Sequence, residues 1–473
     1  MALLEAASAI LLIAWAFTLA PLQGPDEPAH FSYAQYLAET GHKPSVTTGT
    51  HPEATKGIAA LGMFNLDQLA GVYDARPAWT KLELQRYGGI IEGFGHKGDE
   101  DGSGPNPIAK NPPLYYAYQV VPYYVGSLGS FFDRLTVMRL ASGLLILAAI
   151  AFTWLAAAEL FAAAFPRLVA TGCVALLPQL TSLGATINAD AMLVAVWSAF
   201  TYVALRIVKR GPSLLSLLSL AALAAASLLT HGRGTAIIPA FLVTLIVAMM
   251  RMKRPSLATV VRWLVPTFAL LIGAFALYRW KLAPQGGAYG GEVVLAPSGG
   301  LSITGFLSTT WQFYFPRLPL MPGRVGPPYG FHQVAIESFF GRFATLEIAY
   351  PDIVYALIQA ACLLGLVGLV AALSTRWAAV RRHWAELTVL AAIAASMIGL
   401  LHLASYRSLV GSGDPLITGR YVLPLATVFG LTVAFVVSSA RPRTSAVLGT
   451  LILTSLLALN LGGLMLSYYR FYG

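Results

Sequence analysis

The sequence predicts an all-α membrane protein that crosses the bilayer about eleven times. Of its 473 residues, 57% are hydrophobic and only 11% are charged, whereas soluble domains carry about 25% charged residues. Apolar runs of roughly 20 residues, the length that spans a bilayer as a helix, recur along the chain. The expected spans are residues 2–20, 136–162, 166–184, 190–207, 213–230, 235–250, 257–278, 352–374, 385–405, 417–438 and 444–466.

Basic residues in the short loops predict the orientation of the spans. They collect near residues 206–210, 251–254, 376–382 and 441–443. If the spans alternate in direction, these loops share one side, which the positive-inside rule makes cytoplasmic. The N-terminus is then cytoplasmic, and two long external connections follow the first and seventh spans, at residues 21–135 and 279–351. The loops account for the net charge of +10, so we expect no nucleic-acid partner. The whole chain, 1–473, is expected to be one transmembrane domain.

The two cysteines predict no metal site or disulfide framework, and the first apolar segment predicts a helix that is kept. Cys173 and Cys362 each lie inside an apolar run, without Cys or His at a metal-ligand spacing, so neither a zinc site nor a disulfide is expected. The first apolar segment has Glu5 near its start where a signal peptide would be basic. We therefore expect a retained first helix.

An acidic cluster, Pro25-Asp26-Glu27-Pro28-Ala29-His30-Phe31, follows the first span. Flanking prolines predict that the two carboxylates lie on non-helical backbone. In this charge-poor chain we interpret Asp26 as a general base and Glu27 as the neighbour that shapes its site. The alternative is that Asp26 only caps the helix expected over residues 29–40. That helix is expected to lie along the membrane interface with its aromatic edge at headgroup level.

Further polar residues recur at the external ends of later spans, where ionisable groups usually face a cavity or a partner. Arg420 lies just inside a span, and its guanidinium suits a phosphate, although snorkelling to the interface is the alternative. Arg233 and Arg407 are weaker candidates of the same kind, and His231 is expected to be structural. Other candidates for substrate binding are Asn188 and Asp190, which could instead cap the fourth span, together with His30, Tyr115 and Tyr421.

Arg342 stands among aromatic residues in Phe339-Phe340-Gly341-Arg342-Phe343. This pattern is typical of a sugar-stacking surface or of an aromatic belt at the membrane interface.

Taken together, these motifs resemble a known family. The acidic cluster, Asn111-Pro112-Pro113-Leu114-Tyr115-Tyr116, Asn188-Ala189-Asp190, Phe340-Gly341-Arg342-Phe343 and Gly419-Arg420-Tyr421 occur in the order expected of the bacterial DUF2142 membrane proteins, a branch of the GT-C glycosyltransferase superfamily. The resemblance covers residues 21 to about 424.

The resemblance implies a GT-C-like fold and an activity. GT-C enzymes take a sugar from a polyprenyl-phosphate carrier on the outer membrane face and pass it to an acceptor, here a cell-envelope glycan or lipid. Asp26 would be the base, Glu27 its support, and Arg420 would neutralise the leaving phosphate. The acidic cluster and Arg420 are therefore expected to be the two halves of one site, meeting across a cavity. The location would be the bacterial inner membrane, with the active site facing the periplasm. Transfer would be inverting if one base aligns the acceptor opposite the departing phosphate.

No cofactor is required by this chemistry, because an arginine can stabilise the phosphate. A divalent cation held by Asp26 or Glu27 is the alternative, since carboxylates are natural ligands of such ions. Two other functions stay open from the sequence. One is a flippase or transporter of lipid-linked glycans, which would favour broken helices and polar groups near the bilayer midplane. The other is a ligase that joins a finished glycan to another polymer.

Overall fold

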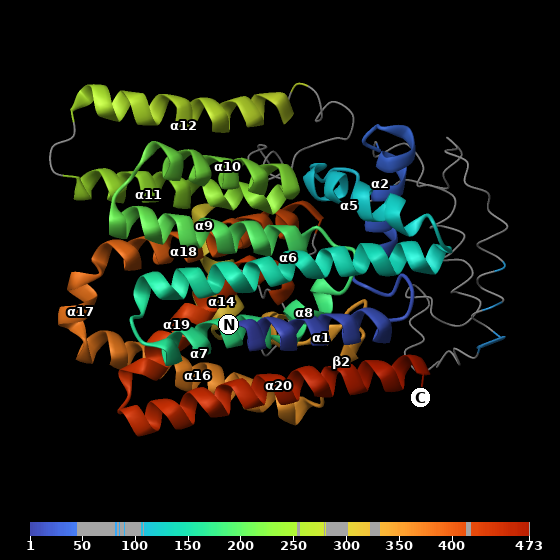
Figure 1. Cartoon of the computed structure of the whole chain (residues 1–473). Helices are drawn as coiled ribbons and strands as arrows, with labels where there is room; N and C mark the ends of the chain where they lie inside the picture. The colour runs from blue at the N-terminus through green and yellow to red at the C-terminus, as the bar shows by residue number, and fades with distance from the viewer. Residues whose placement is uncertain are drawn as a thin grey trace.

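The structure is a computed structural model of the full chain. It describes residues 1–44, 81–82, 85, 89, 106, 108–252, 256–278, 280, 301–321, 332–412 and 418–472. The expected external connections 21–135 and 279–351 are therefore described only in part. Most of the described chain is helical, and most of the long helices run side by side along the bundle (Figure 1).

The N-terminal half supplies the helices around the site. They are α1 (Ala2–Thr18), α2 (Glu27–Thr40), α5 (Leu114–Gly126), α6 (Phe131–Leu160), α7 (Ala164–Ala175), α8 (Pro178–Gly184), α9 (Asp190–Arg210), α10 (Leu214–Thr230), the 3-10 helix η2 (Gly232–Ala236), α11 (Ile237–Arg251) and α12 (Leu257–Leu277). Among them, α6 packs against α9, α5 and α1, and α2 packs against α5.

The C-terminal half completes the bundle. It contains α14 (Ile303–Tyr314), α15 (His332–Phe340), the two short antiparallel strands β1 (Arg342–Phe343) and β2 (Ile348–Ala349), α16 (Asp352–Thr375), α17 (Trp377–Arg382), α18 (Trp384–Ser412), the 3-10 helix η5 (Gly419–Leu425), α19 (Ala426–Ser439) and α20 (Pro442–Tyr472). Here α19 packs against α7, and α18 packs against α11 and α9.

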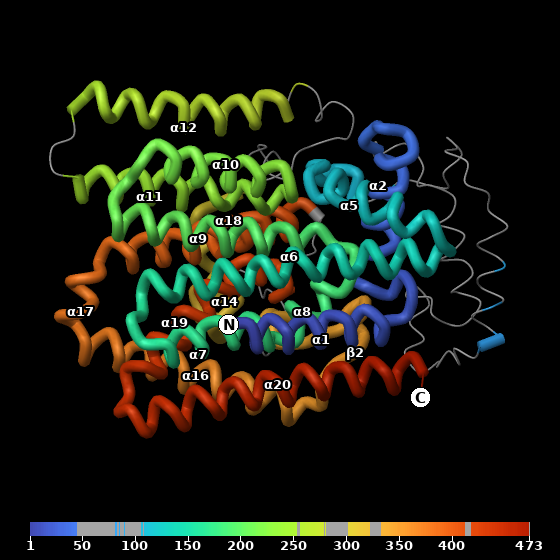
Figure 2. The backbone as a smooth tube through the Cα atoms, viewed as in Figure 1, coloured from blue at the N-terminus to red at the C-terminus, as the bar shows by residue number. Residues whose placement is uncertain are grey.

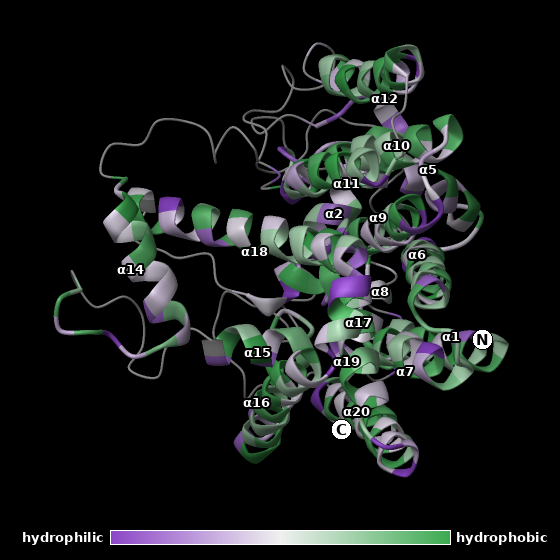
Figure 3. Cartoon of the chain, turned by 90° about the vertical axis from the view of Figure 1, so that its left-hand side faces the viewer, coloured by the Kyte–Doolittle hydropathy of each residue, from purple (hydrophilic) through white to green (hydrophobic). Residues whose placement is uncertain are grey.

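The helix lengths confirm a polytopic all-α membrane protein. In the described part of the chain, eight helical segments are long and apolar enough to cross a membrane, and α1, α7 and α10 are shorter apolar helices. The outer helices α12 and α16 bury only 11% of their most apolar window, and Figure 3 shows their hydrophobic surfaces at the edge of the bundle. Exposed apolar faces of this size are stable in lipid, which satisfies no backbone polar group but accepts apolar side chains.

Basic residues gather at one of the two ends of the bundle. Arg210 pairs with Glu159 at the close of α6, and Arg251 pairs with Glu386 at the start of α18. Helix α17, which contains Arg381 and Arg382, lies at this end, whereas α2 and α5 lie at the other (Figure 2). The basic loops thus do gather at one end of the bundle, as the loop charges predicted.

The expected span 166–184 is not one helix. It is divided into α7 and α8, because Pro178 starts α8 and has no N–H to continue the helix. Asn460 of α20 forms hydrogen bonds on both sides of this break. Its Nδ2 donates to the Leu176 carbonyl (3.3 Å) and to the Thr181 hydroxyl (2.7 Å). Its Oδ1 accepts from Trp15 Nε1 of α1 at 2.8 Å. Three helices are thereby tied at the break, which positions the loop into α9.

Two expectations about local structure were wrong. Asp26 is non-helical (φ 56°) as expected, but Glu27 begins α2, because the proline that follows in the first helical turn loses no hydrogen bond. The aromatic face of α2 does not lie at headgroup level either: Phe31 and Tyr33 are fully buried. Phe31 packs against Phe131 (ring centroids 5.2 Å apart), so α5 and α6 cover this face.

Candidate active site

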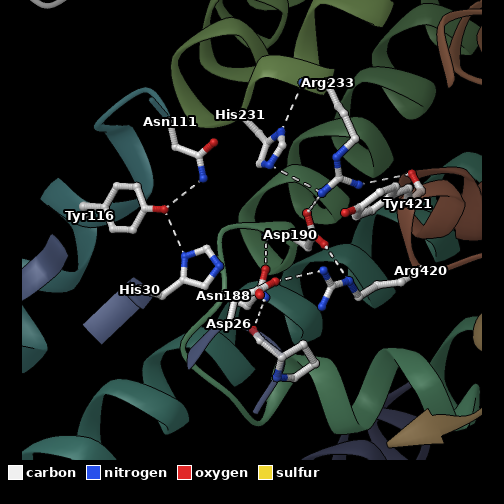
Figure 4. A network of polar contacts seen from close by, with 11 residues as sticks. Asp26, His30, Asn111, Tyr116, Asn188, Asp190, His231, Arg233, Arg420 and Tyr421 are labelled. Atoms are coloured by element: carbon white, nitrogen blue, oxygen red, sulfur yellow. Dashed lines mark hydrogen bonds and ion pairs between the residues drawn. The ribbon is translucent and has the colours of Figure 1, made fainter. Parts of the chain in front are cut away.

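Asp26 and Arg420, separated by 394 residues in the chain, meet at the end of the bundle opposite the basic loops. Arg420 Nη2 donates to Asp26 Oδ2 at 3.0 Å (Figure 4). Asp26 occupies the N-cap position of α2, but its side chain makes no capping hydrogen bond. Its backbone is left-handed (φ 56°), a conformation that Asp tolerates better than most residues. Helix capping alone therefore does not account for this carboxylate, which points to an arginine.

The two partners differ in exposure. The Asp26 side chain is 56% exposed, whereas that of Arg420 is 8% exposed. Arg420 therefore does not snorkel; it is a buried cation below a carboxylate that faces solvent. The preceding residue, Gly419, lets this part of the backbone lie close against α15, because a Cβ at residue 419 would lie 1.8 Å from the Ala335 carbonyl oxygen. The Gly419 N–H also donates to the Ser338 hydroxyl at 2.6 Å.

A second ion pair lies directly beside the first. Asp190, the first residue of α9, pairs through Oδ1 with Arg233 of η2, and its Oδ2 lies 3.8 Å from Arg420 Nε. Arg233 also donates to the Tyr421 carbonyl at 3.3 Å. Both guanidinium groups lie near the Tyr421 ring, with the Cζ of Arg233 at 4.1 Å and that of Arg420 at 5.4 Å from its centre. Two carboxylates and two guanidinium groups thus share one small volume.

Asn188 links this cluster to the acidic turn. Its Nδ2 donates to the Pro25 carbonyl at 2.9 Å, and its Oδ1 accepts from the Asp190 N–H at 2.9 Å. Asn188 therefore both shapes the start of α9 and holds the residue before Asp26. One side chain thus serves both the start of α9 and the assembly of the site, through its two different atoms.

Glu27 takes no part in this surface, because it is fully buried. Arg139 of α6 donates to both of its oxygens, at 2.7 and 2.6 Å, and the N–H groups of Gly24 and Ile187 donate at 3.0 and 3.1 Å. Arg139 gives its three remaining donors to the carbonyls of Ala16, Leu19 and Ala20. Glu27 therefore anchors the turn and does not meet a substrate.

Glu27 also does not fit the alternative of a divalent-cation site. Four N–H donors already surround its carboxylate, and a cation would have to displace Arg139. Within the described residues, no group of three or more His, Cys, Asp or Glu side chains is arranged to hold a metal ion.

His30 lines the same region from α2 but is buried. Its Nδ1 lies 2.9 Å from the Tyr116 hydroxyl, which accepts from Asn111 Nδ2 at 3.1 Å. A neutral imidazole can accept the Tyr116 proton at Nδ1. Burial lowers the pKa of His30 from 6.5 to about 4, and burial together with Arg233 lowers that of His231 to about 3.

This depression predicts a stability that depends on pH. Between pH 6.5 and about 4 the unfolded chain binds a proton at residue 30 that the folded chain excludes. The free energy of unfolding should therefore fall as the pH falls through this window. In detergent, His30→Asn should show a smaller drop in Tm between pH 7 and 5 than the wild type. Equal drops would contradict a neutral buried His30.

Tyr115, Arg342 and Arg407 complete the candidate residues. Tyr115 is fully buried on α5, where its hydroxyl meets Ser142 at 2.8 Å and Gln119 at 2.8 Å, and its ring lies edge-on to His30 with ring centroids 6.4 Å apart. Arg342 lies on β1, and its guanidinium pairs with Glu337 at 2.9 Å. Arg407 is buried towards the end of α18.

The aromatic residues next to Arg342 form neither of the two expected surfaces. Phe340 and Phe343 are 8% and 1% exposed. Phe343 packs on Trp15 with ring centroids 4.7 Å apart and edge-on against Tyr350. Apolar packing between α1 and the short sheet explains the motif.

An apolar cavity of about 310 Å³ adjoins the cluster at Tyr421. Its walls come from α14, α15, α18 and η5, and include Phe313, Phe339, Leu401, Thr418 and Val422. Two polar side chains in the wall, Tyr314 and His402, bond to each other at 2.9 Å. The cavity therefore offers an apolar chamber whose one side is the helix that carries Arg420.

Arg139 was not predicted from the sequence. It lies inside the expected span 136–162, and an arginine at membrane depth usually has a buried partner. That signal was present, but the sequence did not show that the partner is Glu27, 112 residues earlier.

Residues 9–429 match the family described as "Predicted membrane protein (DUF2142)". The chain belongs to the DUF2142 family. This confirms the resemblance drawn from the motifs. No curated protein matches the chain.

Two solved structures that resemble this DUF2142 protein are both ArnT from Cupriavidus metallidurans. The apo form is 14% identical, with 98% of this chain and 75% of that chain covered and a TM-score of 0.48. The form bound to undecaprenyl phosphate is 12% identical, with 100% and 75% covered and a TM-score of 0.48.

Proposed function

We propose that this DUF2142 protein is a GT-C type membrane glycosyltransferase. It transfers a sugar from a polyprenyl-phosphate-linked donor to a hydroxyl of a cell-envelope glycan or lipid, on the outer face of the bacterial inner membrane. The observation that carries the proposal is the half-exposed Asp26 carboxylate bound to the buried Arg420, next to an apolar cavity. Base, phosphate-binding cation and room for a lipid chain lie together.

The chemistry assigns a role to each group. Asp26 removes the proton of the acceptor hydroxyl, whose oxygen attacks the anomeric carbon of the donor sugar. The bond from that carbon to the phosphate oxygen breaks, and the lipid phosphate leaves with an additional negative charge. Arg420, a buried cation beside Asp190 and the Tyr421 ring, stabilises that charge as it develops. No cofactor is required by this route, and attack opposite the departing phosphate inverts the anomeric centre.

Other residues position these groups. Glu27 and Arg139 hold the turn that carries Asp26, and Asn188 ties this turn to α9. Arg233 neutralises Asp190, which leaves Arg420 with positive charge to offer. The cluster lies at helix ends on one side of the bundle, whereas a transporter site is expected near the bilayer midplane. This location favours an enzyme over a flippase.

The experiment uses vesicles that contain the purified full chain, a radiolabelled polyprenyl-phosphate sugar and an acceptor glycan. Mass spectrometry of lipids that co-purify with the protein identifies which carrier to use. Transfer with release of one polyprenyl phosphate per sugar supports the proposal. Movement of the intact donor across the bilayer without its consumption would favour the flippase instead.

Arg420→Gln should weaken donor binding about tenfold or more while acceptor binding changes little, because the lost charge faces the phosphate. Binding of each substrate alone measures this directly. Arg470→Gln, which removes an arginine paired with Glu347 elsewhere, is the matched control. A larger loss of acceptor binding than of donor binding would remove the phosphate role of Arg420.

A further inference from the structure

Arg420 lies against two carboxylates, Asp190 and Asp26, which differ in their exposure to solvent. Asp190 is 2% exposed, begins α9 and is held by Arg233. Asp26 is 56% exposed and has no second cation among its described contacts. Water can solvate Asp26 when it leaves Arg420, whereas Asp190 would become an uncompensated buried charge. If an anion binds at Arg420, Asp26 is therefore the partner that it replaces.

Unsatisfied polar atoms at the same place indicate that a partner is absent. In the described part of the chain, Arg420 Nε and the Thr418 hydroxyl are buried without a hydrogen bond. Native proteins leave few such groups unpaired, because each one loses its hydration. Thr418 also lines the apolar cavity. A ligand with several oxygen acceptors and an apolar chain would satisfy both atoms and fill the cavity.

We propose that the phosphate of the lipid-linked donor displaces Asp26 from Arg420, so that donor binding itself releases the base. The inference rests on the proposed function and adds how donor binding makes the base available. Without donor, the Asp26 carboxylate is occupied by Arg420. With donor, the phosphate oxygens take Nη2, Nε and the Thr418 hydroxyl, and repulsion keeps the freed carboxylate apart from them. Asp26 then accepts the acceptor proton only when a sugar is in place.

The alternative is that the phosphate joins the existing pair and Asp26 stays bound. The two arrangements predict opposite effects of removing the Asp26 charge. Under displacement, Asp26 competes with the ligand, and its loss strengthens binding. If the pair persists, Asp26 orients Arg420, and its loss leaves binding equal or weaker.

The test measures the Kd of undecaprenyl phosphate for the full chain in nanodiscs. Asp26→Asn should bind about three- to tenfold more tightly than the wild type, since a competing charge of an exposed pair is removed. Arg420→Gln should bind more weakly. The double variant should bind like Arg420→Gln, because the gain from Asp26→Asn requires the cation.

Three controls test whether the gain in affinity of Asp26→Asn depends on the position of the lost charge, on the phosphate and on the lipid chain. Asp133→Asn removes one negative charge from a residue that accepts hydrogen bonds from Ser130, and it should leave the Kd unchanged. Undecaprenol, which lacks the phosphate, should show no gain in Asp26→Asn. Inorganic phosphate should bind more weakly than the lipid, which distinguishes a lipid headgroup from a free anion.

Equal or weaker binding of undecaprenyl phosphate by Asp26→Asn would overturn the displacement, even if the wild type proves to transfer sugar. A gain that is equally large for undecaprenol, or for Asp133→Asn, would overturn it as well. If neither the wild type nor any variant binds the lipid phosphate, the proposed function fails and the inference fails with it.

Discussion

Asp26→Asn is expected to lower kcat for sugar transfer by on the order of 10²–10⁴, because the substitution removes the only proposed proton acceptor. Asn has nearly the same shape and also tolerates the left-handed backbone found here (φ 56°). It can still accept a hydrogen bond from Arg420. The fold and the turn should therefore persist while the chemistry is lost. Single-turnover transfer in vesicles measures the effect without product release.

Two measurements make this result interpretable. The Tm of Asp26→Asn in detergent should lie close to that of the wild type, since the Asp26 side chain is half exposed and its ion pair is of the weakly stabilising kind. Asp133→Asn should transfer sugar at the wild-type rate. Transfer by Asp26→Asn at a near wild-type rate would show that another group is the base.

Arg139→Met is expected to lower the free energy of unfolding by about 3–5 kcal/mol, the cost of leaving a buried charge without its partner. Glu27 is fully buried, and Arg139 is 3% exposed. The substitution also leaves three backbone carbonyls at and just beyond the end of α1 without their donor. Equilibrium unfolding in detergent micelles measures the change.

The matched control is Arg210→Met. Arg210 pairs with Glu159 at the same distance, 2.6 Å, as Arg139 with Glu27, but its side chain is 60% exposed and Lys209 lies nearby. The loss should be about 1 kcal/mol or less. Equal losses in the two variants would contradict the anchoring role of Arg139. Partial recovery of stability in Glu27→Gln with Arg139→Met would support it, because the buried charge is then removed.

The helices were largely predictable because lipid imposes a simple rule on sequence. A segment that crosses a bilayer needs about 20 apolar residues and must satisfy its own backbone. All but one of the expected spans coincide with a single helical segment of the described chain. The exception is residues 166–184, where a proline allows two helices and a distant Asn460 satisfies the break. No local rule supplies that partner.

The candidate site was predictable in its residues and in one of its pairings: the acidic turn and Arg420 were expected to form one site, and Asp26 and Arg420 do meet. Asp26 and Arg420 were both singled out as candidates, since charged groups at helix ends in a charge-poor chain are costly. Their contact, and the separate pairing of Glu27 with Arg139, depend on how α2, α6 and η5 pack. Adjacent carboxylates thus received opposite environments, one half exposed and one fully buried.

The sequence by itself determined the membrane class, the family and the acidic turn, because composition and local motifs carry that information. Only the tertiary structure decided which of the two carboxylates faces solvent and that the buried one, Glu27, pairs with Arg139. The physical reason is that burial and ion pairing are set by contacts between segments over 100 residues apart. Loop charge and hydropathy, which are local, do not encode those contacts.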